Sequence, residues 1–567
     1  MTRIDLPAEK KVGHLTLLRQ SRTLSTKEFN ALSFDERLAM VRFGQGRRKY
    51  DLLLEAADAE PMVRRLPAQE IYLLIKEMGA EDVPLLFATV SPEQFTTFID
   101  LDCWRQDRLD PEVALRWMLY LLEAGEEKVL STLQGLDFEL LVLVFKKLIV
   151  ITRGPEDIDD EEELTAALQR DGGYEIECRD SENAKAVLAI LDILFRLDNT
   201  FYLQLMSSVR WEQESLLEEE VYRVRTGRLQ DHGFSDPFEA LAVYAWIDPE
   251  GFDPAGHGKL PMAPEQFEVE APGFVLAAAR PHDLLAEVLA GGVGTDTCWE
   301  LTFLLNKTMA ADRVDVGDPQ QVQASMTEVY QYLNLALEHL AGDDTARAAE
   351  LVEGVYQQTL FRLGFSLTLR LQRRARAILD SAVAPYLDGP FRALTDALCR
   401  SKPRLFEGVE SESRGGERPF ANLHDVRLAE KWLDRLEVQQ RLFVERFPFE
   451  LPAVDELDFA GCVPDDTGDL VLSDFFLTAL ANRILGRSFI PRPLPEEELP
   501  ALHARICSEG RLDEELRRET GHWLDSLEPG AGAFGDYCFG LWEEEFCRLE
   551  AGRIDPRFIS GLIVRLK

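Results

Sequence analysis

The sequence lacks paired cysteines, the usual mark of zinc ribbons, iron–sulfur clusters and thioredoxin-like sites. Its eight cysteines are scattered over 567 residues, and no two of them form a Cys-x-x-Cys pair. At this density in a long chain, reduced and mostly buried thiols are expected.

Catalytic and phosphate-binding motifs are lacking as well. Neither Gly-x-Ser-x-Gly nor His-Glu-x-x-His occurs, and the glycine-rich stretch at 291–294 is not followed by the Lys-Ser/Thr of a phosphate loop. These absences favour a protein without enzymatic activity and without a cofactor.

Positive charge is scarce, because 62 Lys and Arg residues face 101 Asp and Glu residues, for a net charge of −39. A field of this sign repels the phosphates of nucleic acids and the surface of anionic membranes. Nucleic acid is therefore not expected among the partners.

Long apolar runs are also missing. A membrane-spanning helix needs about 20 apolar residues, and the run at 138–151 is interrupted by Lys146 and Lys147. The first residues, MTRIDLPAEKKVGHL, contain no apolar core of the signal-peptide type. We expect a cytoplasmic protein that does not insert into membranes.

What the sequence does contain is an apolar pattern that returns every twelve residues. Ala59, Met62, Val63 and Leu66 stand at i, i+3, i+4 and i+7, which places them on one face of a two-turn helix. The spacing returns three times and, after a break at 103–111, three times more. The seven copies occupy residues 59–66, 71–78, 83–90, 95–102, 117–124, 129–136 and 141–148. The fourth copy loses its apolar character at Asp102.

The joints between copies favour separate short helices over one long rod. Pro67, Gly79 and Pro92 interrupt the pattern, and Ser91 is placed to cap a helix that begins at Pro92. A two-turn helix is unstable alone in water, so each copy must pack against its neighbours. Stacks of this kind present extended surfaces that bind other proteins.

Part of this region resembles a known family. The units LPAQEIYLLIKEMG, AEDVPLLFATV and SPEQFTTFIDLD are similar to the N-terminal helical superhelix of MgtE-type magnesium transporters, and to the helical repeats of the flagellar switch protein FliG. The resemblance covers about residues 50–150 and implies a superhelix of short helices. It does not imply transport, because no CBS-domain or channel pattern follows.

Other segments resemble an uncharacterised bacterial family, known as a domain of unknown function. They are GRLQDHGFSDPFEALAVYAWIDPE, LFRLGFSL, KPRLFEGVESESRGGERPFANLHDVRLAEKWL and IDPRFISGLIV. This resemblance extends over most of the chain and implies no activity.

The chain is too long for one hydrophobic core, and shifts in composition divide it into four predicted domains. These are the helical-repeat domain 1–154, a mixed and mostly helical domain 155–265 that begins with an acidic linker, a helical domain 266–400, and a C-terminal helical domain 401–567 with a mobile loop at 409–418. Short strands are predicted at 171–180 and 273–278. The predicted fold is mainly α, a stack of short twelve-residue helical repeats followed by further helical domains with at most minor β.

An acidic run follows the repeats. Asp157, Asp159, Asp160 and Glu161 are candidate Mg²⁺ ligands, since this ion prefers carboxylate oxygens. A solvated loop entering a helix whose first turn favours acids explains the same run, and the sequence favours this interpretation.

Two further groups are candidate binding residues. Arg228, Asp231 and His232 cluster before a helix that we expect to begin with Asp236 as its cap; here His232 would carry a proton, Asp231 would orient it and Arg228 would hold an anion. A structural turn is the preferred interpretation. Arg370 and Arg374 share a helix face and are placed to meet an anionic partner, although pairing with the chain's own acids is preferred.

The function expected from these observations is that of a non-enzymatic cytoplasmic scaffold or adaptor that binds other proteins through its helical repeats. The alternatives are a regulatory protein that responds to Mg²⁺ and, third, an enzyme with a site near His232.

Overall fold

The computed structural model describes residues 25–44, 46–259, 268–269, 283–411, 415–453, 460–508, 510–549 and 554–566. In these residues the chain is mainly α-helical, with small sheets of two or three short strands, which confirms the predicted fold class. Among the described helices, none combines the length and the apolar character needed to cross a membrane.

Contacts between residues divide the chain into two compact units. Unit 1 comprises Met1–Ala245 and Asp253–Arg362, and unit 2 comprises Trp246–Phe252 and Leu363–Lys567. Helix α22 (Gln357–Leu379) contributes residues to both. The finer division into four domains stays a prediction, and the predicted strand at 273–278 lies outside the described residues.

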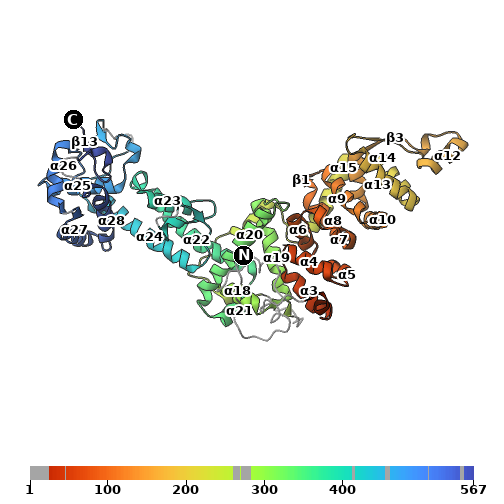
Figure 1. Cartoon of the computed structure of the whole chain (residues 1–567), viewed down its shortest axis with the longest axis horizontal. Coiled ribbons are helices and arrows are strands. Elements are labelled where there is room, and N and C mark those ends of the chain that lie inside the picture. The colour runs from red at the N-terminus through yellow and green to blue at the C-terminus, as the bar shows by residue number, and fades with distance from the viewer. Residues whose placement is uncertain are drawn as a thin grey trace. The chain divides into compact units, whose positions relative to one another are not determined.

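Each of the seven predicted repeats corresponds to one helix of unit 1. Among the described residues, three short helices precede them, α2 (Thr26–Asn30), α3 (Phe34–Phe43) and α4 (Gly46–Glu55). The repeat helices are α5 (Ala59–Arg65), α6 (Ala68–Met78), α7 (Pro84–Thr89), α8 (Pro92–Asp102), α9 (Pro111–Glu123), α10 (Glu126–Gln134) and α11 (Phe138–Leu148). Figure 1 shows them stacked in the order of the sequence.

The joints have the predicted chemistry. Ser91 caps α8, where its hydroxyl accepts a hydrogen bond from the backbone N–H of Gln94 at 3.2 Å. Gly79 ends α6 with a φ of +91°, a conformation that a residue with a Cβ rarely adopts. The repeats are therefore separate helices.

The helices pack mainly on their next-but-one neighbours. Helix α4 contacts α6, α6 contacts α8, and α8 contacts α10, while α5, α7, α9 and α11 make the matching series. The two series form two layers, and the apolar stripe of every helix faces the space between them. Nearly all stripe residues are buried; the partly exposed ones are Ala59, Met78, Tyr120 and Ala124.

Asp102 stands where the fourth copy would have its last apolar residue. Its carboxylate accepts hydrogen bonds from the Tyr72 hydroxyl at 3.0 Å and the Trp117 indole N–H at 2.8 Å, and it forms an ion pair with Lys76 at 2.8 Å. Polar contacts therefore hold this position in the stack, where the other copies have an apolar residue. The break at 103–111 that follows holds a small hairpin of β1 (Trp104–Arg105) and β2 (Arg108–Leu109).

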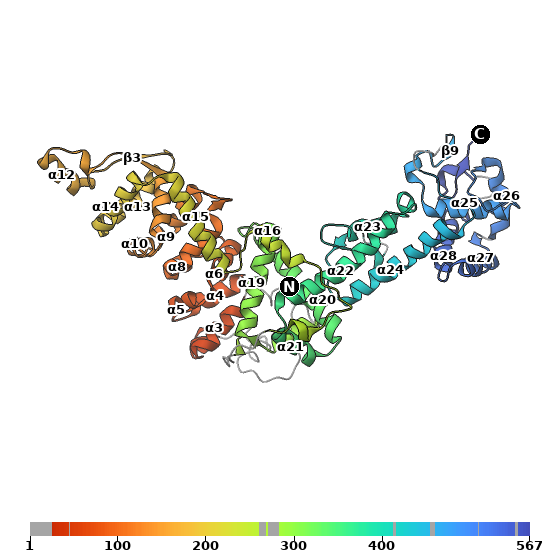
Figure 2. The ribbon, with the colours of Figure 1, turned by 180° about the vertical axis from the view of Figure 1, so that it is seen from behind.

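After α11 the chain forms an antiparallel hairpin of β3 (Ile149–Arg153) and β4 (Glu175–Cys178), the latter within the predicted strand at 171–180. Between the two strands lie a 3₁₀ turn, η2 (Pro155–Asp157), and α12 (Glu161–Asp171), which projects beyond the hairpin in both views (Figures 1 and 2).

The rest of unit 1 is helical. Helices α13 (Ala184–Leu197) and α14 (Asn199–Trp211) extend the stack, and α15 (Glu214–Asp231) folds back onto α11. The remaining elements are α16 (Pro237–Ala240), η3 (Leu241–Tyr244), η4 (Pro254–His257), β5 (Glu268–Val269), α18 (Leu284–Ala290), β6 (Val293–Gly294), α19 (Thr295–Asp312), α20 (Pro319–Ala341) and α21 (Thr345–Gly354).

Unit 2 is mainly helical and contains a three-stranded sheet in which β13 (Val564–Arg565) lies between β10 (Leu494–Pro495) and β9 (Cys462–Val463). Strand β13 runs parallel to β10 and antiparallel to β9. The main helices after α22 are α23 (Gly389–Leu398), α24 (Leu423–Arg441), α25 (Leu472–Ile484), α26 (Leu499–Ile506), α27 (Glu514–Leu527) and α28 (Gly532–Leu541). The α24 and α28 helices each continue into a π-helical turn, η7 (Leu442–Arg446) and η11 (Trp542–Phe546).

One expectation for unit 2 needs correction. Cys507, in β11 (Cys507–Ser508) beside β12 (Arg511–Leu512), forms a disulfide with Cys547, so these two cysteines are not reduced thiols. Their Cα atoms are 5.3 Å apart, within the range a disulfide requires.

The loop predicted at 409–418 lies between β7 (Leu405–Phe406) and β8 (Glu417–Arg418), which pair as a hairpin, and includes β8 itself. Arg418 forms an ion pair with Asp425 at 2.6 Å. Residues 412–414 lie outside the described part, and the mobility of the loop stays a prediction.

The stack predicts a large cost for removing one aromatic ring. Phe98 is fully buried, with ring centroids 5.4 Å from Trp117 and 6.2 Å from Tyr72. Replacing it by Ala in F98A should lower the free energy of unfolding of the stack by about 3–5 kcal/mol, because the cavity cannot close.

Hydrogen exchange of the α6, α8 and α9 amides measures this cost locally, without requiring the two units to unfold together. The matched control is L54A, at a residue 51% exposed on α4, which should change stability by less than about 0.5 kcal/mol. Equal effects of the two substitutions would contradict the packing described above.

Candidate functional site

The predicted residues at the end of α15 line a pocket in unit 1. His232 is the residue that ends α15, and the chain turns there before α16, which begins with Asp236 as its cap and Pro237 as its first residue, as predicted. The pocket has a volume of about 330 Å³ and is lined by Glu93, Thr96, Thr97, Asp100, Asp137, Arg228, Leu229, Asp231 and His232.

Arg228 is held by two carboxylates of the repeat helices. Its Nε lies 2.7 Å from Oδ2 of Asp100, and its Nη1 lies 2.9 Å from Oδ2 of Asp137. Asp100 is 1% exposed; burial raises its pKa, and Arg228 opposes that shift. These contacts join α15 to α8 and to the start of α11, so an anion could reach Arg228 only by displacing a carboxylate.

His232 and Asp231 have exposed side chains. The backbone carbonyl of His232 accepts a hydrogen bond from Asn306 Nδ2 at 2.6 Å, and Asn306 forms a reciprocal amide pair with Gln69. Within the described part of the chain, neither Asp231 nor another residue hydrogen-bonds the His232 ring. The pocket therefore brings the three predicted residues together without the predicted orienting contact.

The acidic run lies around η2 and α12. The Asp157 carboxylate accepts a hydrogen bond from the Gly154 N–H and pairs with Arg210, and these contacts lower its pKa. Asp160 caps α12 by accepting from the N–H of Glu163 at 2.8 Å, while Asp159 and Glu161 are exposed. No three potential ligands among the described residues are grouped to hold a metal ion, and the Mg²⁺ assignment stays a prediction.

Arg370 and Arg374 lie in the part of α22 that belongs to unit 2. Arg370 forms an ion pair with Glu430 at 2.5 Å, and Arg374 pairs with Asp434 at 2.6 Å and with Glu437 at 2.8 Å. All three acids are on α24. The arginines thus connect two helices of one unit through ion pairs within the chain.

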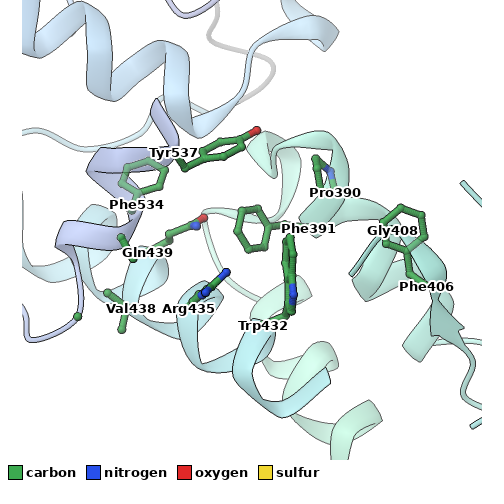
Figure 3. Close-up of a pocket in the computed structure, with 12 residues that line it drawn as sticks. Pro390, Phe391, Phe406, Gly408, Trp432, Arg435, Val438, Gln439, Phe534 and Tyr537 are labelled. Atoms are coloured by element: carbon green, nitrogen blue, oxygen red, sulfur yellow. The ribbon is translucent and has the colours of Figure 1, made fainter. Parts of the chain in front are cut away.

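Unit 2 contains a pocket that the sequence analysis missed. It lies between α23, α24, α28 and the β7–β8 hairpin, has a volume of about 230 Å³, and five of its twelve lining residues are aromatic (Figure 3). Its lining residues, which together we call the aromatic pocket, are Pro390, Phe391, Phe406, Gly408, Trp432, Arg435, Val438, Gln439, Gly530, Ala533, Phe534 and Tyr537.

Two buried carboxylic acids, Asp388 and Asp474, lie next to Tyr537 of this pocket. The Ser473 hydroxyl donates a hydrogen bond to Asp388 Oδ1 at 2.5 Å, and the Tyr537 hydroxyl lies near enough to interact with the same carboxyl. The second oxygen of Asp388 is buried and has no hydrogen-bond partner in the part of the chain that the structure describes. The neighbouring Asp474 accepts hydrogen bonds from the backbone N–H groups of Val471 and Gly561, and so ties the C-terminal segment to α25.

Burial raises the pKa of both carboxyls, because a charge is costly where water is excluded. The pKa of Asp388 rises to about 6, with the Ser473 hydrogen bond acting in the opposite direction. The pKa of Asp474 rises to about 7, with the backbone donors opposing burial and the nearby Asp388 adding to it. Both groups therefore gain charge near neutral pH.

A stability change with pH follows for Asp388. Its folded-state pKa lies above the ordinary value of 3.8, so its carboxyl favours the folded state at low pH, and that contribution is lost as the pH rises through about 6. At pH 8 the D388N variant, which keeps an acceptor for Ser473, should be more stable than the wild type by up to about 3 kcal/mol, at about 1.36 kcal/mol for each unit of pKa shift.

Urea denaturation of both proteins at pH 5 and pH 8 measures this difference, which should shrink at pH 5. The control is D396N, which removes an exposed carboxylate from α23, the helix that begins directly after Asp388. A D388N variant less stable than the wild type at pH 8 would show that the Asp388 charge is stabilised in the fold.

Comparison with known proteins shows the family of the chain. No curated protein and no solved structure matches it. A family model matches residues 26–565, which span both units and both pockets. The chain therefore belongs to the family of unknown function DUF6178.

Proposed function

We propose that the protein is a non-enzymatic scaffold or adaptor that acts in the cytoplasm and binds other proteins through the helical stack of unit 1. The observation that supports it is a group of large apolar side chains exposed around α19, a helix outside the seven repeats that the amide pair of Asn306 and Gln69 joins to α6. On that helix Trp299 is 62% exposed and Phe303 is 44% exposed. The two residues are four apart, so their side chains are neighbours on one face.

The elements packed against α19 add to this surface. Phe238 on α16 is 75% exposed and Leu241 at the start of η3 is 50% exposed, and both elements contact α19. We call Phe238, Leu241, Trp299 and Phe303 the α19 surface. Exposed apolar groups concentrated on neighbouring elements are typical of protein-binding sites, and aromatic residues contribute most of the energy at such sites.

The charge of the chain indicates the kind of partner. At −39, its field attracts basic proteins and repels acidic ones. A partner with an apolar centre and a basic rim matches both the α19 surface and this field. The resemblance of residues 50–150 to the superhelices of MgtE-type transporters and FliG supports the proposal, because helical stacks of this kind present extended binding surfaces.

Co-purification of the tagged chain from its native host tests the proposal. The wild type should retain a stoichiometric partner, and the double variant W299A/F303A should lose it, because its two anchor rings are gone. The matched control is F558A, which removes a 71% exposed aromatic ring of unit 2 and should leave the partner bound. Recovery of the wild type alone at native abundance would overturn the proposal.

A second candidate function is an anion-binding catalytic site at His232. The observation that favours it is the pocket of about 330 Å³, which joins the α15–α16 turn to residues of α8 and α11 that are distant in sequence. In this role Arg228 would release Asp100 or Asp137 to hold the anion, and His232 would transfer the proton.

Titration with inorganic phosphate, followed by NMR of the histidine rings, tests this candidate. A site of this kind predicts a saturable shift of the His232 ring signals, while the exposed His522 of unit 2 should not move. No change at His232 in ten-millimolar phosphate, or an equal change at both rings, would exclude the anion site.

A further inference from the structure

The aromatic pocket of unit 2 has walls from three helices. The ring centroid of Phe391 on α23 is 5.2 Å from that of Trp432 on α24 and 6.1 Å from that of Tyr537 on α28. Phe534 on α28 and Phe406 on β7 complete the wall. An apolar cavity of roughly 150 Å³ suffices for benzene, so about 230 Å³ accommodates an aromatic ring with a short substituent.

One cation lies at this pocket. Arg435 is on the same helix as Trp432, three residues later, and its guanidinium lies 5.6 Å from the centre of the Trp432 ring. Among the described residues no carboxylate forms an ion pair with Arg435, in contrast to Arg370 and Arg374 in the same unit. Its planar group is thus available to an anion from solution, and its geometry matches a carboxylate.

A buried amide adds a second polar group. Gln439 follows Arg435 by one helical turn and is 2% exposed, and none of the described residues donates a hydrogen bond to its Oε1 atom. A buried acceptor without a donor is destabilising, and a ligand that donates a hydrogen bond would relieve this. In Figure 3 the ends of Arg435 and Gln439 lie among the rings of Phe391, Trp432, Phe534 and Tyr537.

We infer that the aromatic pocket is a binding site for a small aromatic carboxylate, with the ring between the aromatic walls and the carboxylate on Arg435. The lining offers contacts to both halves of the ligand. A purely apolar ligand would leave Arg435 without a counter-ion, and a polyphosphate would meet one cation and a mainly apolar wall. A polar substituent with an N–H or O–H group would reach Gln439.

Calorimetry on the full-length chain with phenylacetate as the probe tests the inference. Phenylacetate should bind saturably, and the neutral phenylacetamide, which keeps the ring and the shape, should bind at least tenfold more weakly. The R435M variant should weaken phenylacetate binding at least tenfold and leave phenylacetamide binding unchanged, because it removes the charge and keeps the apolar stem.

The matched control is R427M, which removes an exposed arginine from the same helix away from the pocket and should bind phenylacetate like the wild type. The W432L variant should weaken both probes, since it removes an aromatic wall. The inference is overturned if phenylacetate gives no saturable heat at millimolar concentration, if the amide binds equally well, or if R435M and R427M behave alike. Because Arg435 and Arg427 are both exposed, neither variant is expected to unfold.

Discussion

The fold of unit 1 depends on one constraint, which is that a helix of two turns cannot stay folded alone in water. Each repeat helix is stabilised by burying its apolar stripe against its next-but-one neighbours. The stability of α6 therefore depends on α4 and α8, and that of α7 on α5 and α9. The apolar stripe recurs in every copy, and the joints are short, with a side-chain cap from Ser91 at the start of α8. Stability is therefore shared along the stack and belongs to no single helix.

Where the stripe fails, specific polar contacts replace it. Asp102 receives Tyr72, Trp117 and Lys76 at a position that apolar residues hold in other copies. The ion pairs of Arg228 with Asp100 and Asp137 likewise attach α15 to α8 and to the start of α11. Asp100 is buried and Asp102 and Asp137 are partly buried, so these ion pairs restrict how the helices can slide, because a shift would separate charges that are paired within the fold. A structural ion pair and a catalytic cluster use the same residue types, so the sequence around Arg228 is compatible with either.

The sequence predicted what local periodicity encodes. Seven apolar stripes marked seven helices, Ser91 and Asp236 marked helix starts, and the alternating residues 171–180 contained β4. It did not predict what depends on contacts between distant segments. Cys507 and Cys547 lie 40 residues apart with no paired motif to link them, and the aromatic pocket combines α23, α24 and α28 across almost 150 residues of sequence. Trp432, Arg435 and Gln439 stand at helical spacing on α24, so the sequence indicates a helix face with both aromatic and polar residues. It does not indicate which distant elements pack against that face.

The hairpin of β3 and β4 allows the length of one segment of unit 1 to change without disturbing the repeats. Its strands are paired side by side, so the segment between them, η2 and α12, leaves the stack and returns to it at nearly the same place. Arg210 contacts Glu156 and Asp157, the Trp211 indole N–H donates to Glu156, and Arg153 pairs with Glu163, so these contacts of the segment lie close to the hairpin. Lengthening or shortening it changes mainly the entropy of closing a loop, which grows slowly with length. The hairpin is thus a natural point of insertion, where the chain can acquire or lose sequence while the repeats remain in register.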